Sequence, residues 1–193
     1  MDVTDLREQR DIEQVYQPAE DSHLLATTAC EHICADDRVL DVGTGSGYVA
    51  ATVQERTGAT VVGTDVNPHA CRQARDHGVD VVRTDLVSGI CGSFDVVLCN
   101  PPYLPTDPDE EWDDWMEYAL SGGPTGRAVI NDVLDALRSV LSPSGRAYLL
   151  VSTLSDLDAV TERANENNCE TTIIEEESVP FETLVVFEIT LKH

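Results

Sequence analysis

The sequence of 193 residues has almost no lysine: Lys192 is the only one, and the chain carries 36 acidic residues against 12 basic ones. The formal net charge of −24 would repel nucleic acid at ordinary salt, which argues against a nucleic-acid partner. An acidic surface with arginine retained and lysine nearly lost is also typical of halophilic proteins. The Debye length falls to about 3 Å in molar salt, so in brine this charge would exclude few partners.

Long apolar runs are absent as well. No stretch reaches the roughly 18 apolar residues that a membrane-spanning helix needs. The N-terminal stretch is charged and lacks the apolar core of a signal peptide, so we expect a cytoplasmic protein. Because no internal repeat, low-complexity tract or linker occurs, residues 1–193 should form a single domain with a flexible N-terminus over residues 1–14.

Cysteine pairs with metal-binding spacing are also missing. The six cysteines are scattered without any CxxC pair, which excludes the common zinc-site pattern, and we expect no metal site. A disulfide framework is not expected in a chain of this length. The sequence therefore predicts reduced thiols.

What the sequence does contain is a regular alternation of short apolar runs and amphipathic stretches. Strands are predicted over residues 39–42, 60–65, 79–83, 94–99, 146–151, 171–177 and 183–191. Helices are predicted around residues 24–29 and 154–164 and over 48–56, 67–77 and 126–141. This order predicts an α/β fold of the Rossmann-like type, with a seven-stranded, mostly parallel sheet, a C-terminal antiparallel hairpin and helices on both faces.

A glycine-rich loop follows the first predicted strand. Its residues are Asp41, Gly43, Gly45 and Gly47, in the pattern DxGxGxG. The dinucleotide-binding loop reads GxGxxG and meets a pyrophosphate, whereas an acid beside the loop disfavours a phosphate and suits an ammonium group. A strand-to-helix turn without any ligand is the alternative interpretation.

Two further acids follow the second and third predicted strands. Asp65 lies about 20 residues beyond the glycine loop, where a carboxylate accepts hydrogen bonds from ribose hydroxyls. It could also be the N-cap of the next helix. Asp85 could accept the amino group of adenine, with Leu86 against the ring, although a solvated turn is an alternative. Together these residues indicate an adenosyl ligand without phosphates, S-adenosylmethionine (SAM).

The fourth predicted strand ends in Asn100, Pro101, Pro102 and Tyr103. Proline lacks a backbone donor and fixes its own φ, so the strand must stop here in a stiff bend. The Asn100 side-chain oxygen and the Pro101 carbonyl could each accept one N–H of a planar NH₂ group, on which Tyr103 could stack. A plain Pro-Pro turn is the alternative. The glycine loop, both acids and this motif resemble a class I SAM-dependent methyltransferase of the (N/D)PP(Y/F) type.

A second resemblance narrows the substrate. The stretches VYQPAEDSHLL (15–25), TDLVSG (84–89), GGPTGR (122–127) and LSPSG (141–145) are similar to motifs of the archaeal and eukaryotic branch of HemK-like methyltransferases. The likeness runs in order from residue 15 to 191. It implies N5-methylation of the glutamine in the GGQ motif of a class 1 release factor, the protein of translation termination. An adenine or guanine N-methyltransferase acting on RNA or DNA is the alternative function, and a nucleotide- or NAD-binding module is a second rival.

The resemblance also implies roles for individual residues. Asn100, Pro101, Pro102 and Tyr103 are expected to be catalytic, with Asn100 touching both SAM and the substrate amide. The expected SAM-binding residues are Ser22, Asp41, Gly43, Gly45, Gly47, Asp65, Asp85, Leu86 and Asn100. From local pattern alone, Asp21 and Ser22 also predict a helix N-cap. Asp41 departs from the family, where many members carry Glu, and the acidic loop 104–117 with Trp112 and Trp115 cannot be aligned.

A partner is implied too. Members of this family usually work with a small zinc-binding activator protein, which adds a strand at the edge of the sheet. The third strand should be such an edge, and an apolar edge is a liability unless it is covered. We therefore predict a heterodimer at Val79, Val81, Val82 and Arg83, with the zinc held by the activator. A short edge strand protected by its own charged residues is the alternative.

Overall fold

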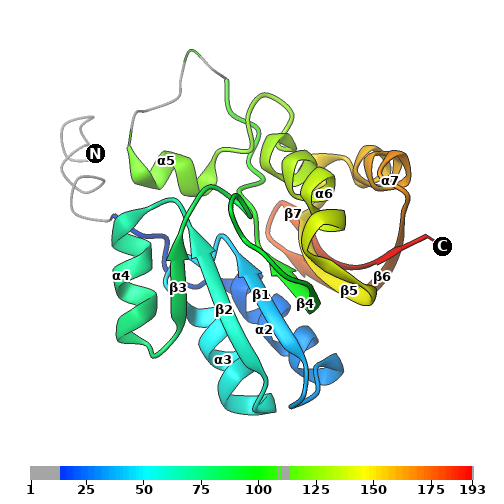
Figure 1. The fold of residues 1–193 in the computed structure, drawn as a ribbon. Coiled ribbons are helices and arrows are strands. Elements are labelled where there is room, and N and C mark those ends of the chain that lie inside the picture. The colour runs from blue at the N-terminus through cyan, green and yellow to red at the C-terminus, as the bar shows by residue number, and fades with distance from the viewer. Residues whose placement is uncertain (1–13, 108, 110–113, 193) are drawn as a thin grey trace.

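A computed structural model describes residues 14–107, 109 and 114–192 (Figure 1). Its strands are β1 (Arg38–Val42), β2 (Thr60–Asp65), β3 (Asp80–Arg83), β4 (Phe94–Cys99), β5 (Leu141–Ser152), β6 (Cys169–Val179) and β7 (Glu182–Leu191). They form one seven-stranded sheet in the order β3-β2-β1-β4-β5-β7-β6. The first five strands pair in parallel, and β7 runs antiparallel to both β5 and β6. The predicted sheet with its C-terminal hairpin is therefore confirmed.

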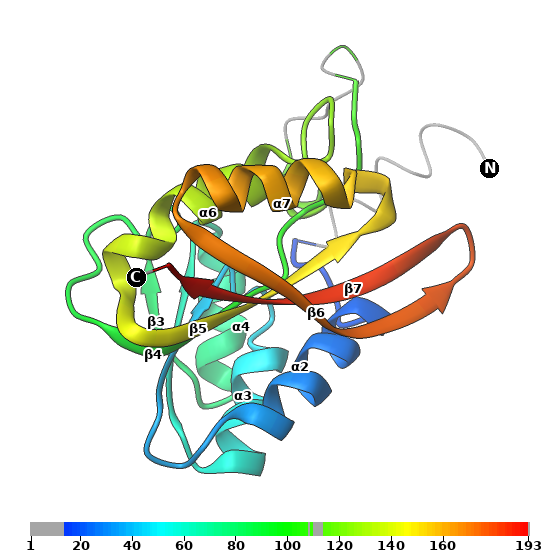
Figure 2. The same cartoon turned by 90° about the vertical axis from the view of Figure 1, so that its right-hand side faces the viewer.

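Helices cover both faces of this sheet (Figures 1 and 2). They are α2 (Glu20–His32), α3 (Tyr48–Thr57), α4 (Pro68–Asp76), α5 (Trp115–Leu120), α6 (Ala128–Val140) and α7 (Leu157–Glu166), with a 3₁₀ turn at Thr153–Ser155. Helices α2, α3 and α4 share one buried apolar cluster with the sheet, and α6 and α7 share the other. No described helix is long and apolar enough to span a membrane.

The two cores follow from the alternation of side chains along each strand. In β1, Val39 belongs to the cluster under α2 and α3, whereas its neighbour Leu40 belongs to the cluster under α6. Successive side chains of a strand point to opposite faces, so a parallel strand covered on both sides needs a continuous apolar run. That is why these strands could be recognised in the sequence.

The boundaries differ from prediction at several places. Strand β5 begins at Leu141, five residues before the predicted start. Helix α2 begins at Glu20 with Ala19 as its N-cap and no side-chain cap bond, so the predicted cap at Asp21 and Ser22 is wrong. Both side chains are buried in the first turn instead. Leu154 lies in the 3₁₀ turn rather than in α7. Strand β6 is longer than predicted because it pairs with β7 along its whole length, through a register shift between Ile173 and Glu175.

Two predictions concern residues that lie wholly or partly outside the described part of the chain. The flexible N-terminus predicted over residues 1–14 lies outside the described residues, apart from Gln14. Trp112 lies outside them as well, whereas Trp115 begins helix α5.

Candidate active site

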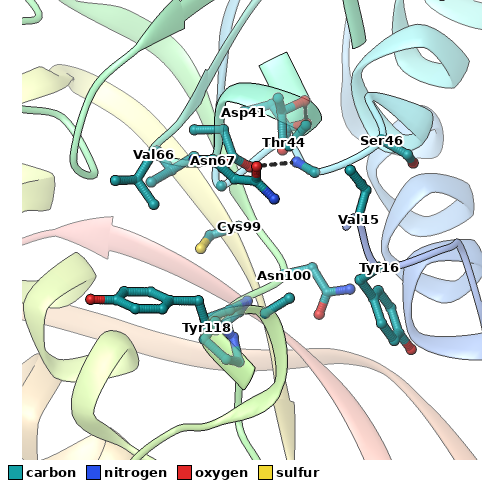
Figure 3. Close-up of a pocket in the computed structure, with 18 of the residues that line it drawn as sticks. Val15, Tyr16, Asp41, Thr44, Ser46, Val66, Asn67, Cys99, Asn100 and Tyr118 are labelled. Atoms are coloured by element: carbon teal, nitrogen blue, oxygen red, sulfur yellow. Dashed lines mark hydrogen bonds between the residues drawn. The ribbon is translucent and has the colours of Figure 1, made fainter. Parts of the chain in front are cut away.

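A pocket of about 340 Å³ opens at the carboxyl ends of β1, β2 and β4 (Figure 3). Parallel α/β sheets place their ligand sites at this edge. The predicted site residues that line the pocket are Ser22, Asp41, Gly43, Gly45, Asp65, Asp85, Leu86, Asn100, Pro101 and Pro102. The structure thus brings together residues from four strand ends and from α2. Gly47 and Tyr103 are not among the lining residues.

Asp41 is the most buried acid of the pocket, with 2% of its surface exposed. Its Oδ2 accepts a hydrogen bond of 2.7 Å from the Thr44 hydroxyl. Burial raises the pKa of the Asp41 carboxyl to about 6; the Thr44 bond opposes this shift, and the nearby Asp65 adds to it. A cationic group in the pocket would relieve this unfavourable burial of charge.

Asp65 supports the glycine loop from the end of β2. One carboxylate oxygen accepts from the backbone N–H of Gly45 and the other from that of Asn67, each at 2.8 Å. The helix N-cap is Asn67, whose side chain accepts from the His69 N–H at 2.8 Å, so the N-cap alternative for Asp65 is wrong. Burial raises the pKa of the Asp65 carboxyl, although its backbone hydrogen bonds oppose this. Each oxygen keeps a lone pair for a ligand hydroxyl.

Gly47 allows α3 and α4 to pack closely against each other. Its φ is +83°, and a Cβ atom there would lie 2.8 Å from the backbone of Ala74 in α4. A side chain would therefore push α3 and α4 apart. Leu86, in contrast, lines the pocket with φ at +46°, a conformation uncommon for any residue other than glycine.

Asn100 follows the last residue of β4 and lies in the pocket between Tyr16 and Cys99 (Figure 3). Its Nδ2 donates a hydrogen bond of 3.3 Å to the Ser22 hydroxyl. Its Oδ1 is buried and has no hydrogen-bond partner among the described residues. Buried polar atoms are almost always paired, so an unpaired acceptor in a pocket indicates a missing donor.

The Tyr103 phenol interacts with Asp21, and Tyr103 is not among the residues that line the pocket. Burial, and after it the carboxylates of Asp21 and Glu182, raise the pKa of the Tyr103 phenol well above its ordinary value. Its backbone carbonyl accepts a bond of 3.2 Å from the buried Ser155 hydroxyl. Stacking of Tyr103 on a substrate amide stays a prediction.

The GGPTGR stretch packs directly behind this motif. Gly126 has φ at +68°, and a Cβ atom there would collide with the carbonyl oxygen of Tyr103. The Ser155 hydroxyl lies 3.2 Å from the Tyr103 carbonyl oxygen and 3.0 Å from that of Gly126, so the two carbonyls share its one hydrogen. Further along, Leu104 pairs with the segment around Ser121 in an isolated parallel bridge. The glycine motif thus holds the bend after Asn100 in place.

Comparison with known proteins places this geometry in a family. The Methyltransferase small domain family matches residues 19–111. A protein of Methanocaldococcus jannaschii named "Putative protein N5-glutamine methyltransferase" is 32% identical over 179 residues, which cover 90% of each chain. Mouse methyltransferase HEMK2 is 37% identical over 151 residues, covering 70% of this chain and 71% of that protein. The chain belongs to the HemK2/Mtq2-like N5-glutamine methyltransferases.

A solved structure agrees with this assignment. It is that of the "E. cuniculi Mtq2-Trm112 complex", described as responsible for methylation of the translation termination factor eRF1. The match has a TM-score of 0.77 and 32% identity, and it covers 93% of this chain and 100% of that one. Fold and sequence thus agree on a SAM-dependent protein-glutamine N-methyltransferase.

The pocket of this methyltransferase suits SAM. Among the described residues, no lysine or arginine lines it, whereas the carboxylates of Asp41, Asp65 and Asp85 do. This set of groups suits an ammonium and hydroxyls and disfavours a pyrophosphate. No group of three or more metal-ligating side chains occurs within residues 14–107, 109 and 114–192.

Sequence reasoning missed four aromatic residues of the site. The pocket is lined by Tyr16, by Tyr48 of α3, and by Trp115 and Tyr118 of α5, whose ring centroids are 5.8 Å apart. Tyr16 lies inside the VYQPAEDSHLL stretch, so its aromatic character was a usable signal. Trp115 and Tyr118 are three residues apart, a spacing that puts side chains on one face of a helix.

Proposed function

We propose that this methyltransferase transfers a methyl group from SAM to the side-chain amide nitrogen of the glutamine in the GGQ motif of a class 1 release factor. The observation that carries the proposal is the buried, unpaired Asn100 Oδ1 at the wall of the pocket. Membership of the N5-glutamine methyltransferases and the likeness to Mtq2 support it.

Methylation of an amide requires the enzyme to activate a poor nucleophile, the amide nitrogen. The lone pair of an amide NH₂ is delocalised, so the nitrogen must be oriented and made more electron-rich. Asn100 Oδ1 can accept one N–H and the Pro101 carbonyl the other, which fixes the nitrogen and favours the positive charge that develops on it. The two prolines keep both acceptors still, and such positioning can lower a barrier by several kcal/mol. When bound, SAM supplies the electrophilic methyl group on its sulfonium.

The other half of the pocket would hold the cofactor. Asp41 is placed to pair with an ammonium group, and Asp65 retains lone pairs for ribose hydroxyls. Asp85 is exposed at the rim, where it could accept an adenine amino group beside Leu86. These assignments are proposals that the affinity measurements described below would test.

A zinc-binding activator of the Trm112 kind is the proposed partner, added as a strand to β3. Strand β3 is one edge of the sheet, and among the described strands it pairs only with β2. Val82 is 45% exposed, which leaves apolar surface at this edge, whereas Val79 is 2% exposed and unavailable to a partner. Covering Val82 would remove an edge that is otherwise open to unspecific pairing.

This interface can be tested by placing a charge on one edge. Val82→Lys should abolish copurification with the coexpressed activator, because the lysine would have to be buried beside the added strand. Ile173→Lys is the matched control, since Ile173 is 44% exposed on β6 at the opposite edge. If both variants retain the activator equally well, the partner binds elsewhere.

The function itself is tested by methyl transfer from labelled SAM in high salt. Purified release factor and total RNA are offered separately, each with and without the activator. We expect label on the release factor, and its loss when the GGQ glutamine is replaced by glutamate. Label on RNA alone would keep the SAM pocket and the role of Asn100, but would make the enzyme a nucleic-acid N-methyltransferase.

A further inference from the structure

The Asn100 amide can work in only one of two orientations. A side-chain amide has an oxygen at one end and an NH₂ group at the other, nearly equal in size. If the NH₂ group faced the substrate, two donors would oppose each other and neither substrate hydrogen would be accepted. The protein must therefore distinguish the two ends of this amide by hydrogen bonding.

The Ser22 hydroxyl distinguishes the two ends of the Asn100 amide. Its hydroxyl lies 3.3 Å from Asn100 Nδ2 and 3.1 Å from Asp21 Oδ1. A hydroxyl has one hydrogen, and a carboxylate oxygen can only accept, so that hydrogen goes to Asp21. Toward Asn100 the Ser22 oxygen is then left as an acceptor, which selects the NH₂ end and leaves Oδ1 without a donor among the described residues.

Other donors also hold the Asp21 carboxylate in place, the Tyr103 phenol among them. Its Oδ1 also accepts from the Ser22 backbone N–H, and its Oδ2 accepts from the Tyr16 hydroxyl at 3.4 Å. Burial, with Asp21 next, raises the pKa of the Tyr16 phenol to about 12, so this donor stays protonated near neutral pH. Asp21 and Ser22 are only 5% and 6% exposed, so water competes little for these bonds.

We infer that Asp21 and Ser22 are positioning residues, which fix the Asn100 amide with its oxygen toward the substrate nitrogen. The inference rests on the proposed transfer to an NH₂ group and assigns Ser22 a role other than binding SAM. It also explains why both residues lie buried in the first turn of α2 instead of capping it.

The test is a double-mutant cycle on the methyltransferase with its activator. Ser22→Ala should lower kcat about tenfold or more, since small misplacement of a reacting group is costly. Asp21→Ala should lower it further, because the freed Ser22 hydrogen can then bond Asn100 Oδ1 and reverse the amide. Asp21→Asn keeps an oxygen for Ser22 and Ser22→Thr keeps the hydroxyl, so both should restore most of kcat.

The combined variant gives the decisive readout. Once Asp21 is alanine, the Ser22 hydroxyl no longer helps, so Asp21→Ala/Ser22→Ala should be no slower than Asp21→Ala alone. The dissociation constant of SAM should stay within about threefold throughout. Thr28→Ala is the matched control, because Thr28 is also 6% exposed on α2 but does not line the pocket.

Two results would overturn the inference. One is a raised SAM dissociation constant in Ser22→Ala with kcat unchanged, which would make Ser22 a cofactor ligand. The other is strictly multiplicative loss in the combined variant. Failure of the proposed function looks different, because the unmodified enzyme would then label RNA and not the release factor. The same cycle is then measured on RNA, whose amino groups pose the same orientation requirement.

Discussion

The two halves of the pocket differ in how far the protein satisfies its own polar groups. In the cofactor half, the Asp41 and Asp65 carboxylates are bonded to Thr44, Gly45 and Asn67. In the acceptor half, Asn100 Oδ1 is buried with no partner among the described residues. An unpaired buried group costs about 1–3 kcal/mol. On the proposed function, the first half is built before SAM binds, whereas the second is completed by a substrate that brings an N–H donor.

Removing the unpaired acceptor should have the largest effect. Asn100→Ala should lower kcat about 10²- to 10³-fold, the loss typical of deleting one preorganised polar group of an active site. The SAM dissociation constant should change only modestly, because the cofactor half is held by its own bonds. Kinetics with labelled SAM, with calorimetry for SAM binding, would measure both. Asn131→Ala on α6 is the control, and near-normal turnover in Asn100→Ala would remove this residue from catalysis.

Displacing the bend behind Asn100 should come next. In Gly126→Ala the new Cβ would collide with the Tyr103 carbonyl, so we expect kcat to fall about tenfold or more and stability to fall by roughly 1–3 kcal/mol. Gly78→Ala is the control, since Gly78 has φ at +82° but open space around its Cβ. In denaturant unfolding, Gly78→Ala should lose only the stability that a side chain at positive φ costs, without any collision. Equal kcat in both variants would mean that the bend tolerates the displacement.

Changes in the cofactor half should act on affinity instead. Asp65→Ala removes the acceptor of two backbone N–H groups and the proposed ribose contact, so the SAM dissociation constant should rise about tenfold or more. Asp95→Ala is the matched control, because Asp95 also accepts a backbone N–H, from Arg38, at the opposite end of the sheet. Unchanged SAM affinity by calorimetry in Asp65→Ala would take this carboxylate out of the pocket's function.

The smallest effect should be a pH dependence from Asp41. Its pKa of about 6 means that the carboxylate becomes protonated as pH falls through 6, so SAM affinity should drop by up to about tenfold per pH unit below that point. Folding stability should depend on pH in the opposite direction from SAM affinity. A raised pKa means that the folded state binds the proton more tightly, so this group's contribution to stability declines as pH rises from about 4 to 6.

One substitution checks both signs. Asp41→Asn should bind SAM weakly at every pH, yet without ligand it should be as stable as the unmodified protein or more so at pH 8. Titrating SAM affinity and thermal unfolding between pH 5 and 8 would measure this. A flat pH profile in the unmodified protein would show that Asp41 does not pair with the ligand.

The sheet and the pocket could be predicted because their signals are local. A strand buried on both faces must be an apolar run, and its end is marked by residues such as Gly43 or Pro101. The predicted residues at these strand ends, Asp41, Asp65 and Asn100 among them, do meet in one pocket. Parallel pairing brings the carboxyl ends together whatever the lengths of the connections between them.

Contacts across long sequence distances could not be predicted. Asp21 and Ser22 looked like a helix cap, but Ser22 bonds Asn100, which lies 78 positions away. The bond that the Tyr103 carbonyl accepts from Ser155, 52 positions away, had no local signal either. In both cases a tertiary bond outweighed the local pattern. Helix α5 was missed for another reason, because its six residues are too few for a helical period to be recognised.

The two outer strands of the sheet also predict how the chain behaves at high concentration. Strand β6 also exposes an apolar side chain, Ile173, but the charges of the exposed Glu175, Glu176 and Glu177 beside it oppose pairing with another copy. Strand β3 has no such row of like charges, and its exposed Val82 is apolar. A preparation without the activator should therefore aggregate through β3 and stay soluble along β6. On the proposed interface, solubility on expression should depend on the activator as well as on this chain.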